Sequence, residues 1–218
     1  MSSFYTSSHK ELQKKFDTEL LAQGLEDAIV SSTLDTAANE FISGRNLFFL
    51  STVNSSKHPT VSYKGGDVGF VRVLNEHTLV FPSYNGNGMH LSTGNILAHP
   101  EIGLLFIDFD KPNRLRIQGR AKLVFSGPLL DSYPGAEMVV EVTISQTWVN
   151  CSRYIHQHTP RSLSPHIPKQ DETVPIALWK RISGISALLN EKEQAVIIKA
   201  GEISAEEYAR KLQAGEVV

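Results

Sequence analysis

Short strand-like segments follow one another from about Asn46 to Val124. The segments are rich in β-branched and aromatic residues, and clusters of Asn, Asp, Gly, Pro and Ser separate them, as is typical of strands joined by turns. They read NLFFLSTVN, TVSYKG, GFVRVLN, TLVFPS, IGLLFIDF and RLRIQGRAKLVF. Six sequential strands with short connections predict a six-stranded antiparallel meander that closes into a small β-barrel.

Helical patterns flank these strands. An apolar stripe predicts a helix over residues 7–25, capped by Ser7 or Ser8, and a second helix over 31–45 has Thr33 or Asp35 near its start and Gly44 as its C-cap. A short helix is expected over 126–136, a further strand over 137–149, and a helical tail over 169–218 with SAEE as a capping box. The predicted organisation is one domain, 1–218, with N-terminal helices (1–44), a barrel core (45–125), remaining barrel and interface elements (126–160), and a C-terminal loop and helices (161–218).

Composition narrows the classes of function. The formal net charge is -2 and no long Lys/Arg block occurs, so the electrostatic footprint of a nucleic-acid-binding protein is missing. No apolar run reaches the length of a membrane span, of about 20 residues. The single cysteine, Cys151, suits a reducing compartment. The chain is therefore expected to be cytoplasmic, with neither nucleic acid nor membrane as a partner.

A polar loop rich in Gly, Asn and Ser lies between the fourth and fifth predicted strands. About a dozen residues separate Pro82 from Ile96, whereas a simple hairpin loop has two to five. Small side chains and accessible amides can form an anion-binding nest, although an elaborate hairpin connection is the alternative interpretation. The candidate ligand-binding residues of this loop are Asn85, Gly86, Asn87, Gly88, Met89, Ser92 and Asn95.

The strands and this loop together resemble the pyridoxamine 5'-phosphate oxidase-like, FMN-binding split-barrel family, in its oxidase-related branch. The matching blocks are RNLFFLSTVNSSKHPTVSYKGGDVGFVRVL, TLVFPSYNGNGMHLSTGNILAHPEIGLLFIDF, RLRIQGRAKLV and WVNCSRYIHQH, in the family's order. The resemblance implies an FMN-binding split β-barrel that forms a homodimer with flavin sites at the interface.

Phosphate ligands carried over from the resemblance fall on Arg72, Ser83 and Ser92. A guanidinium can clasp phosphate through two hydrogen bonds, which makes Arg72 the main expected cation; a solvated arginine on an edge strand is the alternative. The oxidase itself has a basic Ser-Arg-Lys stretch where this chain has His90, Leu91 and Ser92. Fewer cations are therefore available, and the loop amides must contribute more.

Two arginines are candidates for the edge of the flavin ring. Arg114 and Arg116 alternate with apolar residues in a strand, so both point to one face, which an exposed arginine row would also explain. The resemblance puts a Gln at the position of Arg114 and commonly a basic residue at that of Arg116, each close to the flavin. Lys64, beside a Gly-Gly turn, is a further candidate, with a solvated turn lysine as the alternative.

The segment around the only cysteine completes the candidate set. From its residues alone a structural Cys151 is favoured over a reactive one, because no base and orienting partner are fixed by the sequence. The resemblance places Asn150, Cys151 and Arg153 beside the flavin across the dimer interface. His156 and His158 lack a third ligand at a defined spacing, so no metal site is expected.

Function is left with two hypotheses. The first is an FMN-dependent oxidoreductase that acts on a small-molecule substrate or electron donor, with catalytic residues unknown. The second is a non-catalytic flavin-binding carrier, sensor or interaction module. Oxidation of vitamin B6 itself is not expected, since the family's RxH-type C-terminal element has no clear counterpart. A deazaflavin or heme in a related barrel stays open.

Overall fold

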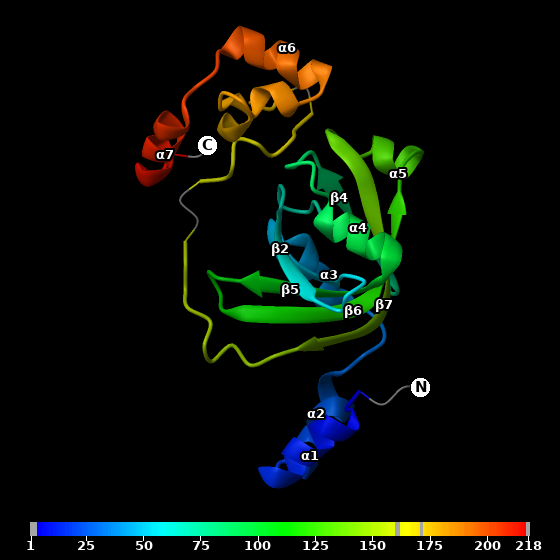
Figure 1. The fold of residues 1–218 in the computed structure, drawn as a ribbon. Coiled ribbons are helices and arrows are strands. Elements are labelled where there is room, and N and C mark those ends of the chain that lie inside the picture. Colours follow the sequence, from blue (N-terminus) through cyan, green and yellow to red (C-terminus); the bar gives the residue numbers. More distant parts are fainter. Residues whose placement is uncertain (1–3, 160–161, 171, 217–218) are drawn as a thin grey trace. The chain divides into compact units, whose positions relative to one another are not determined.

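The computed structural model describes residues 4–159, 162–170 and 172–216 (Figure 1). The chain forms two compact units, Met1–Thr159 and Pro160–Val218. Within the described residues, the first unit contains the β-sheet and five α-helices, and the second contains short helices and one isolated β-bridge, between Ile182 and Ile203. The boundary between the units lies next to residue 161, where the predicted C-terminal segment begins.

A seven-stranded antiparallel sheet forms the centre of the first unit (Figure 1). The prediction of six strands was wrong by one, because the apolar segment after residue 136 joins the same sheet as its longest strand. The strands run in the order β2-β1-β5-β6-β7-β4-β3. Their bounds are β1 Leu47–Val53, β2 Pro59–Gly65, β3 Arg72–Asn75, β4 Thr78–Tyr84, β5 Glu101–Asp108, β6 Asn113–Val124 and β7 Ala136–Val149.

The order of the strands also corrects the predicted meander. Strand β5 pairs with β1 and β6, whereas β4 pairs with β3 and β7, so β4 and β5 are not neighbours. The connection between them contains an unexpected helix, α4 (Leu91–Ala98), which contacts β1 and β6. The edge strands β2 and β3 do not pair with each other, so the sheet does not close through backbone hydrogen bonds. The family resemblance thus predicted the type of sheet correctly but not its closure.

Four more helices belong to the first unit: α1 Ser7–Lys15, α2 Glu19–Ile29, α3 Thr36–Ser43 and α5 Pro128–Asp131. The predicted first helix is broken in two at Asp17, which has a left-handed φ of 57°. Thr6 rather than Ser7 or Ser8 precedes α1 as its N-cap. The predicted caps of α3 are confirmed, because Asp35 accepts a hydrogen bond from the Ala38 amide and the helix ends at Gly44.

Strand alternation gives the sheet two distinct faces. Along β1, the side chains of Phe48, Leu50 and Thr52 are buried and those between them are only partly covered. We call the buried side the inner face and the other the outer face. Phe48 packs against three other rings of the inner core, with centroid distances of 5.8 Å to Phe70, 4.8 Å to Phe81 and 5.2 Å to Phe106.

A bulge between β6 and β7 depends on glycine. The register shifts at Gly119, where a Cβ atom would lie 2.5 Å from the Thr143 carbonyl oxygen. Gly119→Ala is therefore expected to lower the free energy of unfolding by about 1–3 kcal/mol, measured by urea denaturation. Gly103→Ala, whose Cβ would meet nothing closer than 3.7 Å, is the matched control and should be far milder. Equal losses in the two variants would contradict the steric explanation.

The second unit is helical, as predicted for the tail. It contains the 3₁₀ turns η1 (Leu178–Arg181) and η2 (Ser186–Leu188) and the helices α6 (Glu191–Ala200) and α7 (Ala205–Gln213). Ser204 caps α7 by accepting a hydrogen bond from the Glu207 amide, which confirms Ser204 as the cap but is only one of the two hydrogen bonds of the predicted capping box. None of the helices in the described part of the chain has the length and apolar character needed to cross a bilayer.

Candidate functional site

A polar cavity of about 250 Å³ lies where β2, β4 and the N-terminus of α4 meet. It is the place where most of the predicted phosphate-binding residues converge. The predicted residues that line it are Lys64, Ser83, Gly86, Asn87, Gly88, Met89 and Ser92. We call it the Lys64 pocket. Ser62, Tyr84, His90, Leu91, Thr93 and Glu137 complete its lining.

Lys64 supplies the positive charge of this pocket. Side chains two apart on a strand share a face, so Lys64 lies on the same side of β2 as Ser62. Burial lowers the pKa of the Lys64 ammonium, and no hydrogen bond or ion pair joins it to another residue in the described part of the chain. A half-buried cation without a counter-ion is costly, and a bound anion would offset that cost.

The N-terminus of α4 supplies further hydrogen-bond donors to the pocket. The backbone is left-handed at Gly88 (φ 75°) and at the N-cap His90 (φ 47°), and the His90 side chain does not cap the helix. The first amides of a helix have no intrahelical partner and favour a negative charge. Ser92, in the first turn, has its hydroxyl 3.0 Å from that of Ser62. Lys64, the two hydroxyls and the helix N-terminus therefore form a set of donors suited to a phosphate.

The loop between β4 and α4 is held by its own asparagines. Asn85 donates a hydrogen bond of 2.8 Å to the carboxylate of Glu137 on β7. Asn87 accepts one from the Met89 amide at 3.1 Å, which forms a local turn. These contacts fix the loop, so the two amide side chains act in positioning it rather than as free donors.

Asn95 lies behind the Lys64 pocket and not in its lining. Its side-chain amide donates to the hydroxyls of Thr52, at 3.0 Å, and Thr60, at 3.4 Å. These threonines belong to β1 and β2 and also contact each other. Asn95 thereby ties α4 to the hairpin that carries Lys64.

Arg72 has protein partners and is not part of the pocket lining. Its guanidinium donates to the Ser132 hydroxyl at 2.7 Å and to the Ser132 carbonyl oxygen at 2.9 Å. It also lies 3.8 Å from the centre of the Tyr133 ring. Burial raises the pKa of Tyr133 to about 12, so the phenol stays neutral beneath the cation. In this arrangement Arg72 fixes the turn after α5 to β3.

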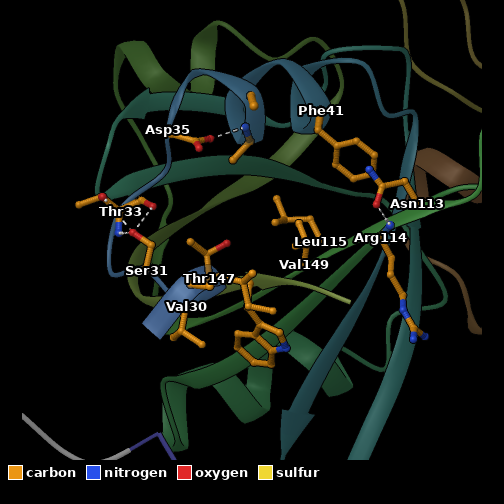
Figure 2. A pocket seen from close by; sticks show the side chains of 15 residues that line it. Val30, Ser31, Thr33, Asp35, Phe41, Asn113, Arg114, Leu115, Thr147 and Val149 are labelled. Atoms are coloured by element: carbon orange, nitrogen blue, oxygen red, sulfur yellow. Dashed lines mark hydrogen bonds between the residues drawn. The ribbon is translucent and has the colours of Figure 1, made fainter. Parts of the chain in front are cut away.

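Arg114, near the start of β6, lines a second cavity, and Asn150 follows directly after β7. A cavity of about 360 Å³ opens beside Arg114, Leu115 and Val149, and Figure 2 shows the Arg114 side chain extending away from the apolar residues at its centre. Among the described residues, the buried Nε of Arg114 and Oδ1 of Asn150 have no hydrogen-bond partner. A buried donor and a buried acceptor are thus left for a ligand or another chain to satisfy.

The remaining predicted residues are dispersed. Arg116 lines a different cavity, together with α1. Cys151 is exposed, and its sulfur accepts a hydrogen bond from the Arg153 amide at 3.4 Å. The Arg153 guanidinium lies 6.0 Å from the Tyr154 ring centre. The structure therefore assembles the loop residues with Lys64 but leaves Arg72, the two strand arginines and the cysteine segment elsewhere.

Sequence reasoning missed several residues of the Lys64 pocket. Ser62 could have been found, because the alternation that puts Lys64 on the inner side of β2 also puts Ser62 there. Glu137 carried no such signal, since only the pairing of β4 with β7 brings it next to the loop. Tyr84 lies directly before the predicted loop. Its pKa is raised, mainly by burial and to a smaller extent by the negative charge of Asp67.

The comparison with solved structures found proteins of low sequence identity and low TM-score. HupZ from Group A Streptococcus is 13% identical, with 58% of this chain and 99% of that chain covered and a TM-score of 0.45. An FMN-binding protein from Syntrophomonas wolfei is 12% identical, covering 65% and 96%, with a TM-score of 0.39. The heme storage protein HutZ from Vibrio cholerae is 17% identical, covering 53% and 94%, with a TM-score of 0.40.

These structural similarities are too low to carry a functional argument, and the comparison with curated proteins found no match. The family comparison is more informative. The model described as pyridoxamine 5'-phosphate oxidase matches residues 34–154, from just before α3 to just after β7. Because this match spans more than half of the sequence and the whole sheet, the chain belongs to the pyridoxamine 5'-phosphate oxidase family.

Proposed function

We propose that this protein binds FMN, with the phosphate in the Lys64 pocket, and that it acts as an oxidoreductase on a small molecule. The observation that carries the proposal is the convergence of Lys64, Ser83 and Ser92 with the N-terminus of α4 in one cavity. Family membership supports a flavin as the ligand, and the donor set suits a phosphate dianion.

The chain fits the phosphate of FMN with one lysine in place of several cations. Lys64 has no internal counter-ion among the described residues, and the helix N-terminus and serine hydroxyls supply further donors. Glu137 lies in the same lining, but Asn85 occupies one of its carboxylate oxygens. These residues would hold the phosphate and exclude water from it.

The ring would need residues from a second copy of the chain. Lys64 pairs with Phe48 on the inner face, whereas Arg114 pairs with Ile107 and alternates with the buried Leu115, which puts it on the outer face. A flavin bound within a single chain would have to contact Lys64 and Arg114 on opposite faces of the same sheet. We therefore propose a homodimer in which Arg114 and the 150–153 segment of one protomer complete the site of the other, so that the unpartnered Arg114 Nε and Asn150 Oδ1 become satisfied.

When bound, FMN supplies hydride or electron transfer, which the side chains of this family member cannot perform. The role of the chain is to hold the phosphate, orient the ring and present a cation near its edge. A flavin carrier without turnover would share the same pocket. Anaerobic mixing of the flavin-loaded protein with NADH or NADPH distinguishes an oxidoreductase from a carrier. The bound flavin loses its visible absorbance on the time scale of turnover only if the protein is an oxidoreductase that uses these donors.

The direct test is to identify the cofactor of the purified protein. Denaturation should release a flavin whose absorbance and mass match FMN. Release of riboflavin, a deazaflavin or heme instead would contradict the assignment of the Lys64 pocket to the FMN phosphate.

FMN binding should weaken at alkaline pH. The folded protein keeps the pKa of Lys64 below its usual 10.5 because of burial, so the ammonium loses its proton earlier than a free lysine does as the pH rises. The Lys64 ammonium therefore attracts the phosphate fully at pH values below its lowered pKa, and this attraction is lost as the pH rises above that pKa. Titrations from pH 7 to pH 10 should show FMN affinity falling relative to riboflavin affinity, and Lys64→Met should remove this difference. An unchanged ratio in the wild type would show that Lys64 does not contact the phosphate.

Mixed dimers test the shared site. Lys64→Met and Arg114→Met homodimers should each bind FMN poorly, but a hybrid dimer has one site with both native residues. After random exchange of subunits, about a quarter of all sites should recover FMN binding. If no binding returns although light scattering and subunit tagging show that hybrids formed, the two residues act within one protomer or not at the same site.

A further inference from the structure

A cavity of about 470 Å³ lies on the outer face of β6 and β7, beneath α1. It is separate from the Lys64 pocket, which lies on the inner side of β2. Its aromatic lining residues are Phe4, Tyr5, His9 and Trp148, and its other polar ones are Arg116, Gln118 and Gln13. The volume is in the range of small-molecule sites, and the combination of aromatic walls with a few polar groups is typical of them.

The aromatic walls are held in place by contacts with one another. The Phe4 ring lies 5.1 Å from the Trp148 ring, at an angle of 78°, and 4.9 Å from the Tyr5 ring, at 68°. The Tyr5 hydroxyl donates to the Ala22 carbonyl oxygen at 3.2 Å, which ties this corner to α2. Rings that meet nearly at right angles form a corner against which a flat ligand can stack on one wall and touch the next with its edge.

Arg116 gives the cavity its charge. It lies on the outer face opposite Trp148 in the β6–β7 register, and no hydrogen bond or ion pair joins its guanidinium to another residue in the described segments. Arg120, four residues along the same strand, instead forms an ion pair with Glu101. Arg116 is thus a cation available beside aromatic walls, with the Gln118 amide on the same face.

We propose that this cavity binds a planar aromatic ligand that carries a carboxylate or similar anionic group. The ring stacks against the Trp148–Phe4 corner, and the anion pairs with the Arg116 guanidinium, which can donate two parallel hydrogen bonds. The resemblance placed Arg116 beside the flavin, whereas the cavity assigns it a different ligand. The site lies within one protomer and does not depend on the flavin proposal.

Calorimetry with 2-naphthoate as the probe tests this inference on the full-length protein, and 2-naphthalenemethanol is the neutral probe of the same shape. Wild type should bind 2-naphthoate more tightly than the alcohol. Arg116→Met should weaken 2-naphthoate binding at least about tenfold and leave binding of the alcohol unchanged. Trp148→Leu should weaken binding of both probes, because it removes the stacking surface.

Arg120→Met is the matched control, since it removes a guanidinium from the same strand outside the cavity, and it should bind 2-naphthoate like the wild type. Equal affinities of wild type and Arg116→Met for 2-naphthoate would overturn the proposal, as would the absence of binding.

A titration with saturating FMN present decides whether the cavity is a separate site. If 2-naphthoate binds with the same affinity when FMN is present, the cavity is a separate site. If FMN competes with 2-naphthoate, the cavity belongs to the flavin site and the proposal is overturned. Loss of FMN binding in Lys64→Met with naphthoate binding intact would leave this inference standing.

Discussion

Lys64→Met is expected to weaken FMN binding at least about tenfold and to leave riboflavin binding nearly unchanged. Lys64 is the only lysine or arginine among the described residues that line the pocket, and its charge-assisted hydrogen bonds to a phosphate should be worth about 1.5–3 kcal/mol each. Riboflavin lacks the phosphate, so its affinity should not depend on the Lys64 ammonium. Fluorescence titration of the apoprotein with both flavins measures the two affinities.

The same substitution should raise the thermal stability of the flavin-free protein at neutral pH. A lysine whose pKa is lowered in the folded state opposes folding at every pH below that pKa, and the penalty fades as the pH rises toward 10.5. Met keeps the apolar stem and removes the charge. Lys111→Met, on the exposed turn between β5 and β6, is the matched control and should change neither affinity nor melting temperature. Parallel losses of FMN and riboflavin affinity in Lys64→Met would point to damage of the pocket rather than a missing phosphate contact.

Arg72→Met is expected to reduce stability by about 2 kcal/mol, because it removes two hydrogen bonds to Ser132 and the cation over the Tyr133 ring. Urea denaturation of the flavin-free protein measures this loss. The ratio of FMN to riboflavin affinity should stay close to that of the wild type, since the guanidinium is held by the turn after α5.

The assignment of Arg72 to the FMN phosphate, which came from the family resemblance, predicts the opposite pattern. In that case stability would be preserved, and FMN affinity alone would fall at least about tenfold. Ser132→Ala separates the two further, because it removes the partner hydroxyl without removing the cation. A stability loss in Ser132→Ala together with normal flavin binding would support the structural role of Arg72.

Most of the secondary structure could be predicted because its signals are local. Alternation of apolar and polar residues marked the strands, and Asp35 and Ser204 marked helix starts through hydrogen bonds that reach only three residues along the chain. The alternation also placed Arg114 and Arg116 on one face, and the structure agrees. The loop after β4 was predicted as a binding segment from its composition; most of its named residues line the Lys64 pocket, but Asn85 and Asn95 do not.

Helix α4 escaped prediction because its stability does not come from its own pattern. LSTGNILA contains a glycine and several poor helix formers and lacks a broad apolar stripe. Asn95 and Ser92 instead bond to Thr52, Thr60 and Ser62, more than 29 residues earlier in the chain. Contacts of that sequence separation leave no periodic trace.

The sequence by itself determined the strands, their two faces, the family and the segments that carry polar chemistry, because each of these depends on neighbours along the chain. The tertiary structure alone decided which strands are adjacent, and that decision placed the functional groups. Pairing of β4 with β7 brought Glu137 to the loop, and the position of β3 turned Arg72 toward Ser132. Arg114 and Arg116 share a face but border different cavities, because α1 covers only the second of them. Long-range packing decides which side chains meet at a site, and the local pattern of residues along the chain does not reveal these contacts.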